Sequence, residues 1–437
     1  MWAARFRARQ YIKGSLWLLP LIGAVLGSLL ALGDLVVEEH LTLPAAWTYS
    51  ADTASGVLTA IVGAMVGLLG FVVTIGVLVV QTATGTLSPR FMRIWYRDRL
   101  QKFVLATFTG TLTFAFGLLR RIGDPEVPSL GVTVAGLLVS LSLVLLLLYL
   151  DRFTHALRPV AVGTSVARAG LRVLAAPSKA AAAARPRGTV RPVTNGPAFE
   201  VRSPRSGVVQ AIYARGLVAT ARRHDCVVVL TRSPGDFVAE GAVLMEVYGG
   251  TERPEERSLA GLVAIGRERT IDQDPAFGLR IVVDIAIRAL SPAVNDPTTA
   301  VQMIDQVEAF LRGVAATPGT GAWDLTDEHD VTRVVAPARR FDTYLRLGVT
   351  EIVAYGARAV QVDRRLAALF VSLGEVVATG DRPALAAAES RFAAAVAAAY
   401  PDPAARAFAL TPDRQGIGGT GAAEPAAVGD GRGRWVG

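Results

Sequence analysis

Five side chains with oxygen donors are gathered in one short stretch of the sequence, and their types would suit a divalent cation. They are Gln273, Asp274, Asp284, Asn295 and Asp296. Carboxylate and amide oxygens are the ligands that Ca²⁺ and Mg²⁺ prefer in proteins. One hypothesis for this stretch is therefore a metal site, which requires the chain to bring three short segments together.

A structural role explains the same residues without a metal, and it is the interpretation that we adopt. Residues 277–290 are apolar on nearly all sides, which predicts a buried helix. Its charged residues Arg280, Asp284 and Arg288 are four positions apart, so they share one face and can pair there. Asp296 precedes a proline, a pattern typical of a capped helix start. We predict a structural ion-pair and cap cluster, and no metal site.

The sequence His224-Asp225-Cys226 places three residue types of nucleophilic catalysis side by side. Neighbouring side chains on a strand point to opposite faces, so these three cannot converge on one substrate. The other histidines have no ligand partner at helical spacing. We therefore interpret the three residues as a polar turn that enters a strand.

Several classes of protein are excluded by residues that the sequence uses sparingly. Cys226 is the only cysteine, so neither an intrachain disulfide nor a cysteine-based metal cluster can form. No lysine follows Lys179, so the rest of the chain cannot carry biotin or lipoate, form a Schiff base or supply a P-loop lysine. The net charge of +8 is spread along the chain, which argues against a nucleic-acid groove. We predict a protein that is not an enzyme, has no cofactor and binds no nucleic acid.

A second candidate site follows the uncharged, glycine-rich stretch of residues 60–80. Small polar residues continue this stretch, and such residues can line a water-filled constriction. The pore-lining candidates are Gln81, Thr84, Ser88 and Arg90. The alternative is that these residues are ordinary at a membrane interface, and that Gly63 and Gly67, in GxxxG spacing, let a neighbouring helix approach closely.

These candidates depend on helices that cross a membrane. The chain is 51% hydrophobic and has a mean hydropathy of +0.40, which favours a membrane domain joined to a soluble domain. Residues 1–158 form the predicted α-helical transmembrane domain. Its four transmembrane helices are expected at about 15–32, 57–80, 103–119 and 130–150.

The charges of the loops predict the orientation in the membrane. The loop between the second and third spans carries five basic residues and one acidic residue. The loop between the first and second spans carries four acidic residues and no lysine or arginine. Because cytoplasmic loops are enriched in lysine and arginine, we expect a multi-pass protein of the bacterial inner membrane with both termini in the cytoplasm.

The polar half of the chain is predicted to form a cytosolic α+β domain. Residues 159–198 are expected to be a helical linker region and residues 199–250 a small β unit with short alternating strands. Residues 251–410 form the main α+β domain, and the Gly- and Ala-rich residues 411–437 a disordered tail.

The small β unit is similar to a known hairpin. The pattern Gly235-Asp236-Phe237-Val238-x-x-Gly241-x-x-Leu244 resembles the hairpin of biotinyl- and lipoyl-like barrel-sandwich domains, in which the glycines permit tight turns. Residues 245–247, Met-Glu-Val, stand where the carrier lysine would be sought. Without that lysine a swinging-arm role is excluded, and a structural or docking module remains.

The chain as a whole resembles a family of bacterial predicted membrane proteins, domain of unknown function 2254. The resemblance covers about residues 10–400 and rests on the motifs Gln81-x-Ala83, Leu87-Ser88-Pro89-Arg90, Gly235-Asp236-Phe237-Val238-x-x-Gly241, Gln273-Asp274-x-x-Phe277-Gly278-x-Arg280, Asp284-Ile285-Ala286-x-Arg288-Ala289-Leu290-Ser291-Pro292 and Asn295-Asp296-Pro297-x-Thr299-Ala300. It implies a multi-span inner-membrane protein with a cytosolic C-terminal domain. It implies no activity, substrate or catalytic residue.

Two functions are compatible with these observations. The first is a non-enzymatic homo-oligomer that conducts or gates a small solute or ion, with the cytosolic domain as an assembly ring or a sensor. Because the predicted spans carry no charge within the membrane, such a pore would have to form between subunits. The alternative is a membrane-anchored sensor or scaffold whose β unit and buried helices bind a cytosolic partner or ligand.

Overall fold

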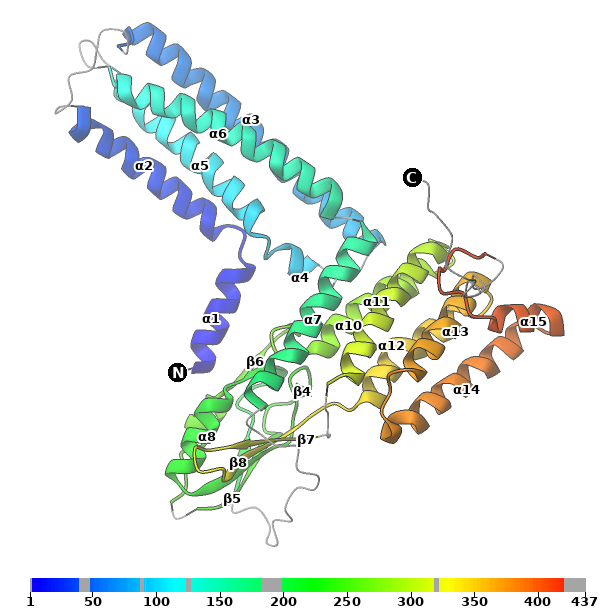
Figure 1. Cartoon of the computed structure of the whole chain (residues 1–437). Helices are drawn as coiled ribbons and strands as arrows, with labels where there is room; N and C mark the ends of the chain where they lie inside the picture. Colours follow the sequence, from blue (N-terminus) through cyan, green and yellow to red (C-terminus); the bar gives the residue numbers. More distant parts are fainter. Residues whose placement is uncertain are drawn as a thin grey trace, which may run out of the picture. The chain divides into compact units, whose positions relative to one another are not determined.

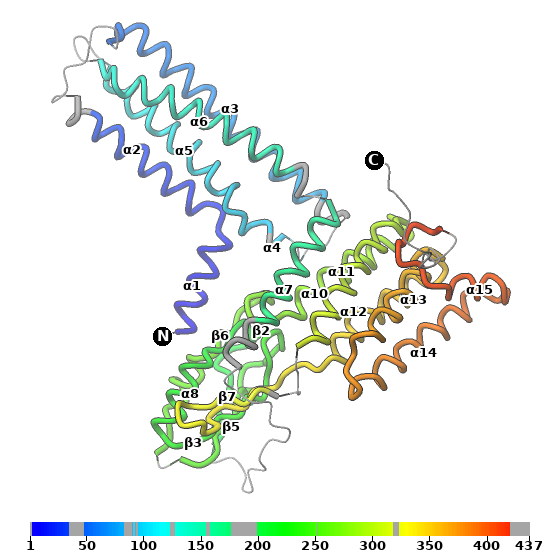
Figure 2. The backbone as a smooth tube through the Cα atoms, in the orientation of Figure 1, coloured from blue at the N-terminus to red at the C-terminus, as the bar shows by residue number. Residues whose placement is uncertain are grey.

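The chain folds into two compact units, which the computed structural model in Figure 1 shows and Figure 2 traces along the backbone. The membrane unit contains Ala8–Val162, and the α+β unit contains Met1–Arg7 together with Gly163–Gly437. The structure describes residues 2–38, 48–86, 90, 92–122, 127–156, 158–181, 199–250, 252–317 and 322–419.

The membrane unit is built of helices. They are α2 (Leu18–Glu38), α3 (Ala51–Thr86), the short α4 (Met92–Trp95), α5 (Arg99–Leu119) and α6 (Ser129–Ala156). Among the described residues, three stretches are long and apolar enough to cross a bilayer, namely Ala51–Thr82, Arg99–Leu119 and Ser129–Phe153. They correspond to the last three predicted spans.

The first predicted span has a different form. Helix α2 satisfies the criteria for a span only together with α1 (Trp2–Gly14), and the two helices are bent by 75° at a short break. Pro20 lies in the first turn of α2, where its missing N–H removes no hydrogen bond of the helix. The predicted number of four spans therefore holds only if this bent pair is counted as one.

Helices α2 and α5 pack closely through glycines. A Cβ atom added at Gly23 would lie 2.1 Å from the carbonyl oxygen of Ala106, and one added at Gly27 would lie 2.1 Å from that of Gly110. The Thr113 hydroxyl of α5 also donates a hydrogen bond to a carbonyl of α2 at 2.9 Å. Such small-residue contacts are a common means of helix association in membranes.

The glycines that the sequence nominated for helix packing lie elsewhere. A Cβ atom added at Gly63 or Gly67 would meet no atom of the described chain within 4 Å. The buried residues of α3 are spaced by three, four or seven positions and include Leu58, Met65 and Val72. Gly63 and Gly67 are exposed on α3, so their role in helix packing stays a prediction, whereas Gly23 and Gly27 form a close helix contact within the described residues.

The α+β unit contains two sheets that share one core. The strands are β1 (Phe199–Arg202), β2 (Gly207–Ile212), β3 (Cys226–Leu230), β4 (Phe237–Val238), β5 (Val243–Gly249), β6 (Val263–Gly266), β7 (Ala322–Thr326) and β8 (Thr332–Pro337). One sheet has the order β1-β5-β3-β8-β7 and the other the order β4-β2-β6. Only β3 and β8 pair in parallel within the described ladders. Both sheets bury valines in the common core, for example Val201, Val209 and Val334.

The sheets extend beyond the predicted β unit of residues 199–250. Strand β6 completes the smaller sheet, and β7 and β8 complete the larger one. The hairpin between β3 and β5 turns at Gly235 and Gly241, whose φ angles of 94° and 78° favour glycine. Of residues 245–247, which stand where a carrier lysine would be sought, Met245 and Val247 are buried in the core. Two short helices, α8 (Ala214–Arg223) and α9 (Glu256–Ala260), cover the strands.

The rest of this unit is helical. The helices are α7 (Pro159–Ala181), α10 (Pro275–Ala289), α11 (Pro297–Ala315), α12 (Phe341–Gly356), α13 (Val360–Gly374), a 3₁₀ turn (Thr379–Asp381), α14 (Arg382–Ala399) and α15 (Pro403–Leu410). Helix α10 packs against α11 and α12, and α11 packs against α13 (Figure 1). As its apolar sequence predicts, α10 is buried on most sides. A Cβ atom added at Gly170 of α7 would lie 2.8 Å from the ring of Phe310, so α7 also lies close to α11.

Residues 411–419 are ordered, although composition placed them in a disordered tail. The carboxylate of Asp413 accepts hydrogen bonds from the backbone N–H groups of Gln415, Gly416 and Gly418 at 3.0, 3.0 and 2.9 Å. The buried Arg364 donates to the carbonyl oxygen of Thr411 at 3.1 Å. These contacts fix a Gly-rich segment whose composition alone indicates disorder. Residues 182–198 of the predicted linker and 420–437 of the predicted tail lie outside the described residues.

Candidate ligand-binding site

Gln273, the first residue of the stretch for which a cation site was considered, binds the end of strand β2. Its Oε1 accepts a hydrogen bond from the backbone N–H of Ile212 at 2.8 Å, and its Nε2 donates to the carbonyl oxygen of Ile212 at 3.2 Å. One amide thus satisfies both backbone groups of a strand residue. Gln273 therefore ties the segment before α10 to the smaller sheet.

Asp274 is the centre of a buried ion cluster. Only 1% of its side chain is exposed, and its carboxylate lies 2.7 Å from Nη2 of Arg269 and 3.1 Å from Nη1 of Arg339. Burial raises the pKa of Asp274, and the charges of Arg339 and Arg269 act in the opposite direction. A Cβ atom added at Gly235 would lie 2.2 Å from Oδ2 of Asp274. Glycine is therefore required at position 235 for two reasons: a side chain there would collide with the Asp274 carboxylate, and the φ angle is positive.

The same cluster joins three segments that are distant in sequence. Arg339, just before α12, also pairs with Asp236 at 3.3 Å and donates to the carbonyl oxygen of Pro234 at 3.1 Å. We refer to Asp274, Arg269, Arg339 and Asp236 as the Asp274 cluster. Sequence reasoning missed both arginines, since no local spacing links Arg339 to a carboxylate 65 positions away.

The ion pair expected on α10 has a third member. Arg280 lies 2.6 Å from Oδ1 of Asp284, and it also binds both carboxylate oxygens of Glu351 on α12. Hydrogen bonding to Glu351 is the largest cause that raises the pKa of Arg280. Arg288 lies half-buried on the same helix. The charged face of α10 therefore fastens this helix to α12.

Asp296 caps helix α11. Its Oδ1 accepts from the backbone N–H of Thr299 at 3.0 Å, and its Oδ2 accepts from the hydroxyl of the same residue at 2.5 Å. Asn295, just before it, has a φ of 47° and forms part of the turn between α10 and α11. Among the described residues, no group of three or more His, Cys, Asp or Glu side chains could hold a metal ion. The contacts of Asp296 are those of the predicted helix cap, and the absence of a metal site in this stretch stays a prediction.

The His224-Asp225-Cys226 sequence forms a turn and the start of a strand. His224 follows the end of α8, Asp225 has a φ of 45°, and Cys226 begins β3. The carboxylate of Asp225 pairs with Arg333 at 2.7 Å. Burial raises the pKa of the Cys226 thiol, which disfavours the nucleophilic thiolate.

The pore-lining candidates are only partly visible in the structure. Gln81 is exposed on α3, and Arg90 is exposed after it. The side chain of Thr84 and the whole of Ser88 lie outside the described residues. The role of these four residues in lining a pore therefore stays a prediction.

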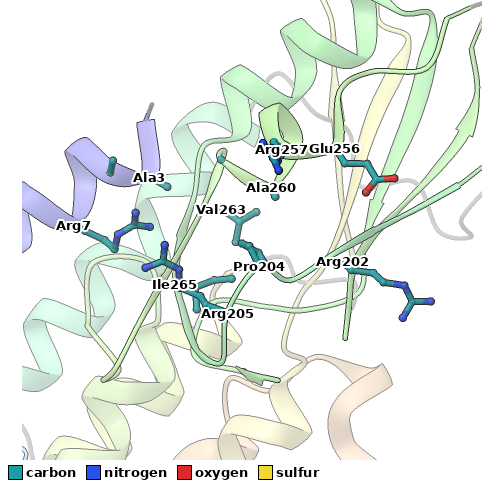
Figure 3. A pocket seen from close by; sticks show the side chains of 12 residues that line it. Ala3, Arg7, Arg202, Pro204, Arg205, Glu256, Arg257, Ala260, Val263 and Ile265 are labelled. Atoms are coloured by element: carbon teal, nitrogen blue, oxygen red, sulfur yellow. The ribbon is translucent and has the colours of Figure 1, made fainter. Parts of the chain in front are cut away.

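The α+β unit contains a pocket of about 430 Å³, shown in Figure 3. Helix α1, the turn between β1 and β2, helix α9 and strand β6 form its walls. The apolar lining consists of Ala3, Ala4, Pro204, Ala260, Gly261, Val263 and Ile265, and the charged lining of Arg7, Arg202, Arg205, Glu256 and Arg257. The volume lies in the range of roughly 300–1,000 Å³ that is typical of small-molecule sites.

The charges of the pocket are unbalanced. Arg202 pairs with Glu200 at 2.5 Å, and the one acidic lining residue pairs with an arginine outside the pocket. Within the described residues, Arg7, Arg205 and Arg257 have neither an ion pair nor a side-chain hydrogen bond. In Figure 3 the side chains of Arg7 and Arg205 extend toward one another. Burial, and after it the charge of Arg205, lowers the pKa of Arg7.

The first turns of α1 are fixed to the sheets. The Trp2 ring stacks on the Tyr213 ring with centroids 5.1 Å apart and planes 8° from parallel. The backbone N–H of Ala3 donates to the carbonyl oxygen of Gly261 at 3.0 Å. The small side chain of Ala3 is buried against Ala211 and Ala264, which lets the helix approach closely. This segment lies within the predicted transmembrane domain of residues 1–158, and no local pattern links it to residues 202–265, so the pocket wall was not predicted.

Comparison with known proteins identifies the family. The sequence model of the family described as predicted membrane protein (DUF2254) matches residues 13–372. The chain belongs to the DUF2254 family. Uncharacterized proteins of Mycobacterium bovis and Mycobacterium tuberculosis are each 29% identical to it over 368 residues, which cover 80% of this chain and 70% of each relative. No solved structure matches this DUF2254 chain.

The family match confirms the resemblance that the motifs indicated. The DUF2254 region contains the spans, the Asp274 cluster and helices α10 to α12. Of the pocket, Arg205 and Arg257 lie within the match, whereas Arg7 precedes its first residue. The protein is accordingly a predicted membrane protein with several apolar helices and a separate α+β region.

Proposed function

We propose that this DUF2254 protein is a membrane-embedded sensor, in which a small ligand in the pocket of the α+β unit changes the state of the membrane helices. The supporting observation is that α1 supplies one pocket wall through Ala3, Ala4 and Arg7. The same helix continues to Gly14, and α2 begins at Leu18. The wall that a ligand would contact is therefore separated from α2, the helix of the first predicted span, only by the short, bent break.

The second half of α1 is held within the membrane unit. Arg97 donates a hydrogen bond to the side chain of Gln10. Nζ of Lys102, which is 5% exposed, donates to the carbonyl oxygen of Lys13 at 2.6 Å, close to the end of the helix. A cation that binds the terminal carbonyls of a helix also interacts favourably with the helix dipole. A displacement of the pocket wall would thus be passed along a helix that is fastened at both ends.

The proposal includes a location for the ligand. The basic loop after the second span supports an inner-membrane protein with its termini and α+β unit in the cytoplasm. The ligand would then be a cytoplasmic compound or a component of the inner leaflet. A pocket of about 430 Å³ suits a small molecule better than a folded partner, so we favour a sensor over a scaffold.

The homo-oligomeric channel receives less support from the structure. Thr74 and Ser140 are exposed on α3 and α6, and each hydroxyl donates to a carbonyl of its own helix, at 2.9 and 3.0 Å. A hydroxyl that is satisfied in this way can face lipid, so these positions require no water-filled lumen. The channel and the homo-oligomer therefore stay predictions from the sequence.

A pocket-filling substitution tests the sensor without knowledge of the ligand. Ala4 is exposed at the pocket, and Ala4→Trp would occupy part of its volume from the α1 side. We expect this variant to change the amide hydrogen exchange of residues 15–21, measured on the full chain in phospholipid nanodiscs. Ala404→Trp, at an exposed position of α15, is the matched control and should leave that exchange unchanged.

Equal exchange of residues 15–21 in wild type and Ala4→Trp would refute the coupling. Ion currents from the purified protein in planar bilayers, changed by substitution of Gln81, would instead support the channel.

A further inference from the structure

Three arginines from three separate elements meet at the pocket. Arg7 comes from α1, Arg205 from the turn between β1 and β2, and Arg257 from α9 (Figure 3). Each guanidinium presents a planar fork of N–H donors and stays charged at every physiological pH. Because the remaining charges of the pocket are paired, these three leave three positive charges without a counterion among the described residues.

The turn that carries Arg205 is held in place by its neighbours. The backbone N–H of the buried Ser203 donates to the carbonyl oxygen of Ala242 at 2.9 Å, and the Ser203 hydroxyl donates to that of Arg205 at 2.7 Å. The hydroxyl of Ser206 accepts from the backbone N–H of Glu240 at 2.9 Å. A fixed backbone reduces the ordering cost of binding, so this turn presents the Arg205 side chain in advance.

The charge and shape of the cluster select among anions. Arg7 and Arg205 approach each other as like charges, an arrangement that a ligand with two negative charges relieves more than a single carboxylate does. Phosphate monoesters carry nearly two negative charges near neutral pH and offer three strong acceptor oxygens, whereas a phosphodiester carries only one charge. Guanidinium groups bind such oxygens by paired, charge-assisted hydrogen bonds.

We propose that the pocket binds its ligand by a phosphate group, through the guanidinium groups of Arg7, Arg205 and Arg257. The rest of the ligand lies against the apolar wall, to which the buried Val263 and Ile265 belong. This inference rests on the proposed sensor function, because it names the ligand class of the same pocket.

Two sources supply this chemistry. A soluble phosphate compound would enter from the aqueous phase, whereas a phospholipid would enter with its head group from the membrane surface. The recognition of phosphate by arginine is the same in both cases. An experiment with one soluble probe and one lipid probe separates them.

The test measures binding to the full chain in nanodiscs. In phosphatidylcholine nanodiscs, isothermal titration with inorganic pyrophosphate reports the soluble source. In nanodiscs that also contain phosphatidic acid, the phospholipid whose head group is a phosphate monoester, native mass spectrometry reports lipid retained by the protein. We expect Arg205→Gln and Arg257→Gln each to weaken binding of the effective probe roughly tenfold to a hundredfold, as expected for lost charge-assisted hydrogen bonds. Arg382→Gln, an exposed arginine of α14, removes the same charge away from the pocket and should leave binding unchanged.

Each outcome decides the proposal. Pyrophosphate binding, or phosphatidic acid retention, that is lost with Arg205→Gln and kept with Arg382→Gln supports it and identifies the source. Binding of neither probe, or binding equally weakened by the control, overturns it. Because the pocket arginines are exposed or half-buried, these variants should fold, and the circular dichroism spectrum checks this.

The sensor can fail separately. Arginine-dependent binding without any change in the exchange of residues 15–21 would keep the phosphate site and refute the sensor. A change of exchange caused by Ala4→Trp, without binding of either phosphate probe, would keep the sensor and refute the phosphate site.

Discussion

Two arginine clusters of the α+β unit differ in what surrounds them. In the Asp274 cluster, Arg269 and Arg339 share a carboxylate that is 1% exposed. In the pocket, Arg205 and Arg257 are exposed beside a cavity, and within the described residues they have no acidic partner. The first cluster closes a folded core, and the second leaves its charge available for a ligand.

This difference separates arginines that stabilise the fold from arginines that could bind a ligand. A buried ion pair is sensitive to substitution, because removal of one partner leaves the other charge buried and unpaired. Such residues can be strictly required without doing chemistry. Arginines that face a cavity without a counterion contribute little to folding, so folding does not explain their position.

The largest expected effect is that of Asp274→Ala. The substitution leaves two arginines around an empty buried site, so we expect the α+β unit to lose about 3–5 kcal/mol of unfolding free energy. Denaturation of the full chain in mild detergent, followed by tryptophan fluorescence, measures the loss. An effect below about 1 kcal/mol would show that the cluster is solvated, and would remove the contrast with the pocket.

Two glycines of one hairpin test how tightly the Asp274 cluster is packed, because Gly235 adjoins the cluster and Gly241 does not. Gly235→Ala combines a φ of 94° with a Cβ atom 2.2 Å from Oδ2 of Asp274, whereas a Cβ atom at Gly241, with a φ of 78°, meets nothing within 4 Å. We expect losses of about 3 kcal/mol for Gly235→Ala and about 1 kcal/mol for Gly241→Ala. Thermal unfolding of both variants tests this. Equal losses would mean that the backbone angle alone, and not the ion cluster, requires glycine at position 235.

Asp363 is a buried carboxylate with no arginine side-chain partner among the described residues, and it should make the stability of the protein depend on pH. Asp363 is 1% exposed and accepts a hydrogen bond from the hydroxyl of Tyr400 at 2.9 Å, and burial raises its pKa to about 6. The unfolded value is about 3.9, so the folded state holds this proton more tightly. Protonated Asp363 therefore stabilises the folded state. This contribution to the unfolding free energy is complete below about pH 4 and is lost as the pH rises through about 6.

The matching variant is Asp363→Asn, which keeps a hydrogen-bond acceptor for Tyr400 and cannot ionise. We expect it to stabilise the protein by about 2 kcal/mol at pH 7.5 and by little at pH 4. Unfolding curves at both pH values provide the test. A variant that is less stable than wild type at pH 7.5 would contradict the assignment.

The smallest expected effect is that of the pocket arginines on stability. Arg205→Gln and Arg257→Gln remove exposed charges without ion pairs, so each should change the unfolding free energy by no more than about 0.5 kcal/mol. The same denaturation experiment measures this beside Asp274→Ala. A loss of several kcal/mol would mean that these arginines hold the fold, and the two clusters would no longer differ in kind.

The sequence predicted features that depend on local patterns. The apolar run of residues 277–290 predicted helix α10, which extends over Pro275–Ala289, because burial on all sides is visible within one segment. The Asp-Pro pair predicted the cap of α11 for the same reason. The last three spans followed from continuous hydropathy.

Features that depend on contacts distant in sequence could not be predicted. Glu351 binds Arg280 across 71 positions, and the pocket combines α1 with residues beyond position 200. Glycine spacing suggested Gly63 and Gly67 for helix packing, and this role stays a prediction. The close helix contact at Gly23 and Gly27 was not predicted, because spacing does not reveal which face of a helix its neighbours cover.

The most direct test of the account is amide hydrogen exchange of the full chain in nanodiscs with and without each phosphate probe, inorganic pyrophosphate and phosphatidic acid. The account predicts slower exchange in residues 2–7 of the pocket wall and a changed rate in residues 15–21 at the start of α2, with both effects absent in Arg205→Gln. Exchange that is unchanged in both segments, or that changes equally in Arg205→Gln, would contradict it.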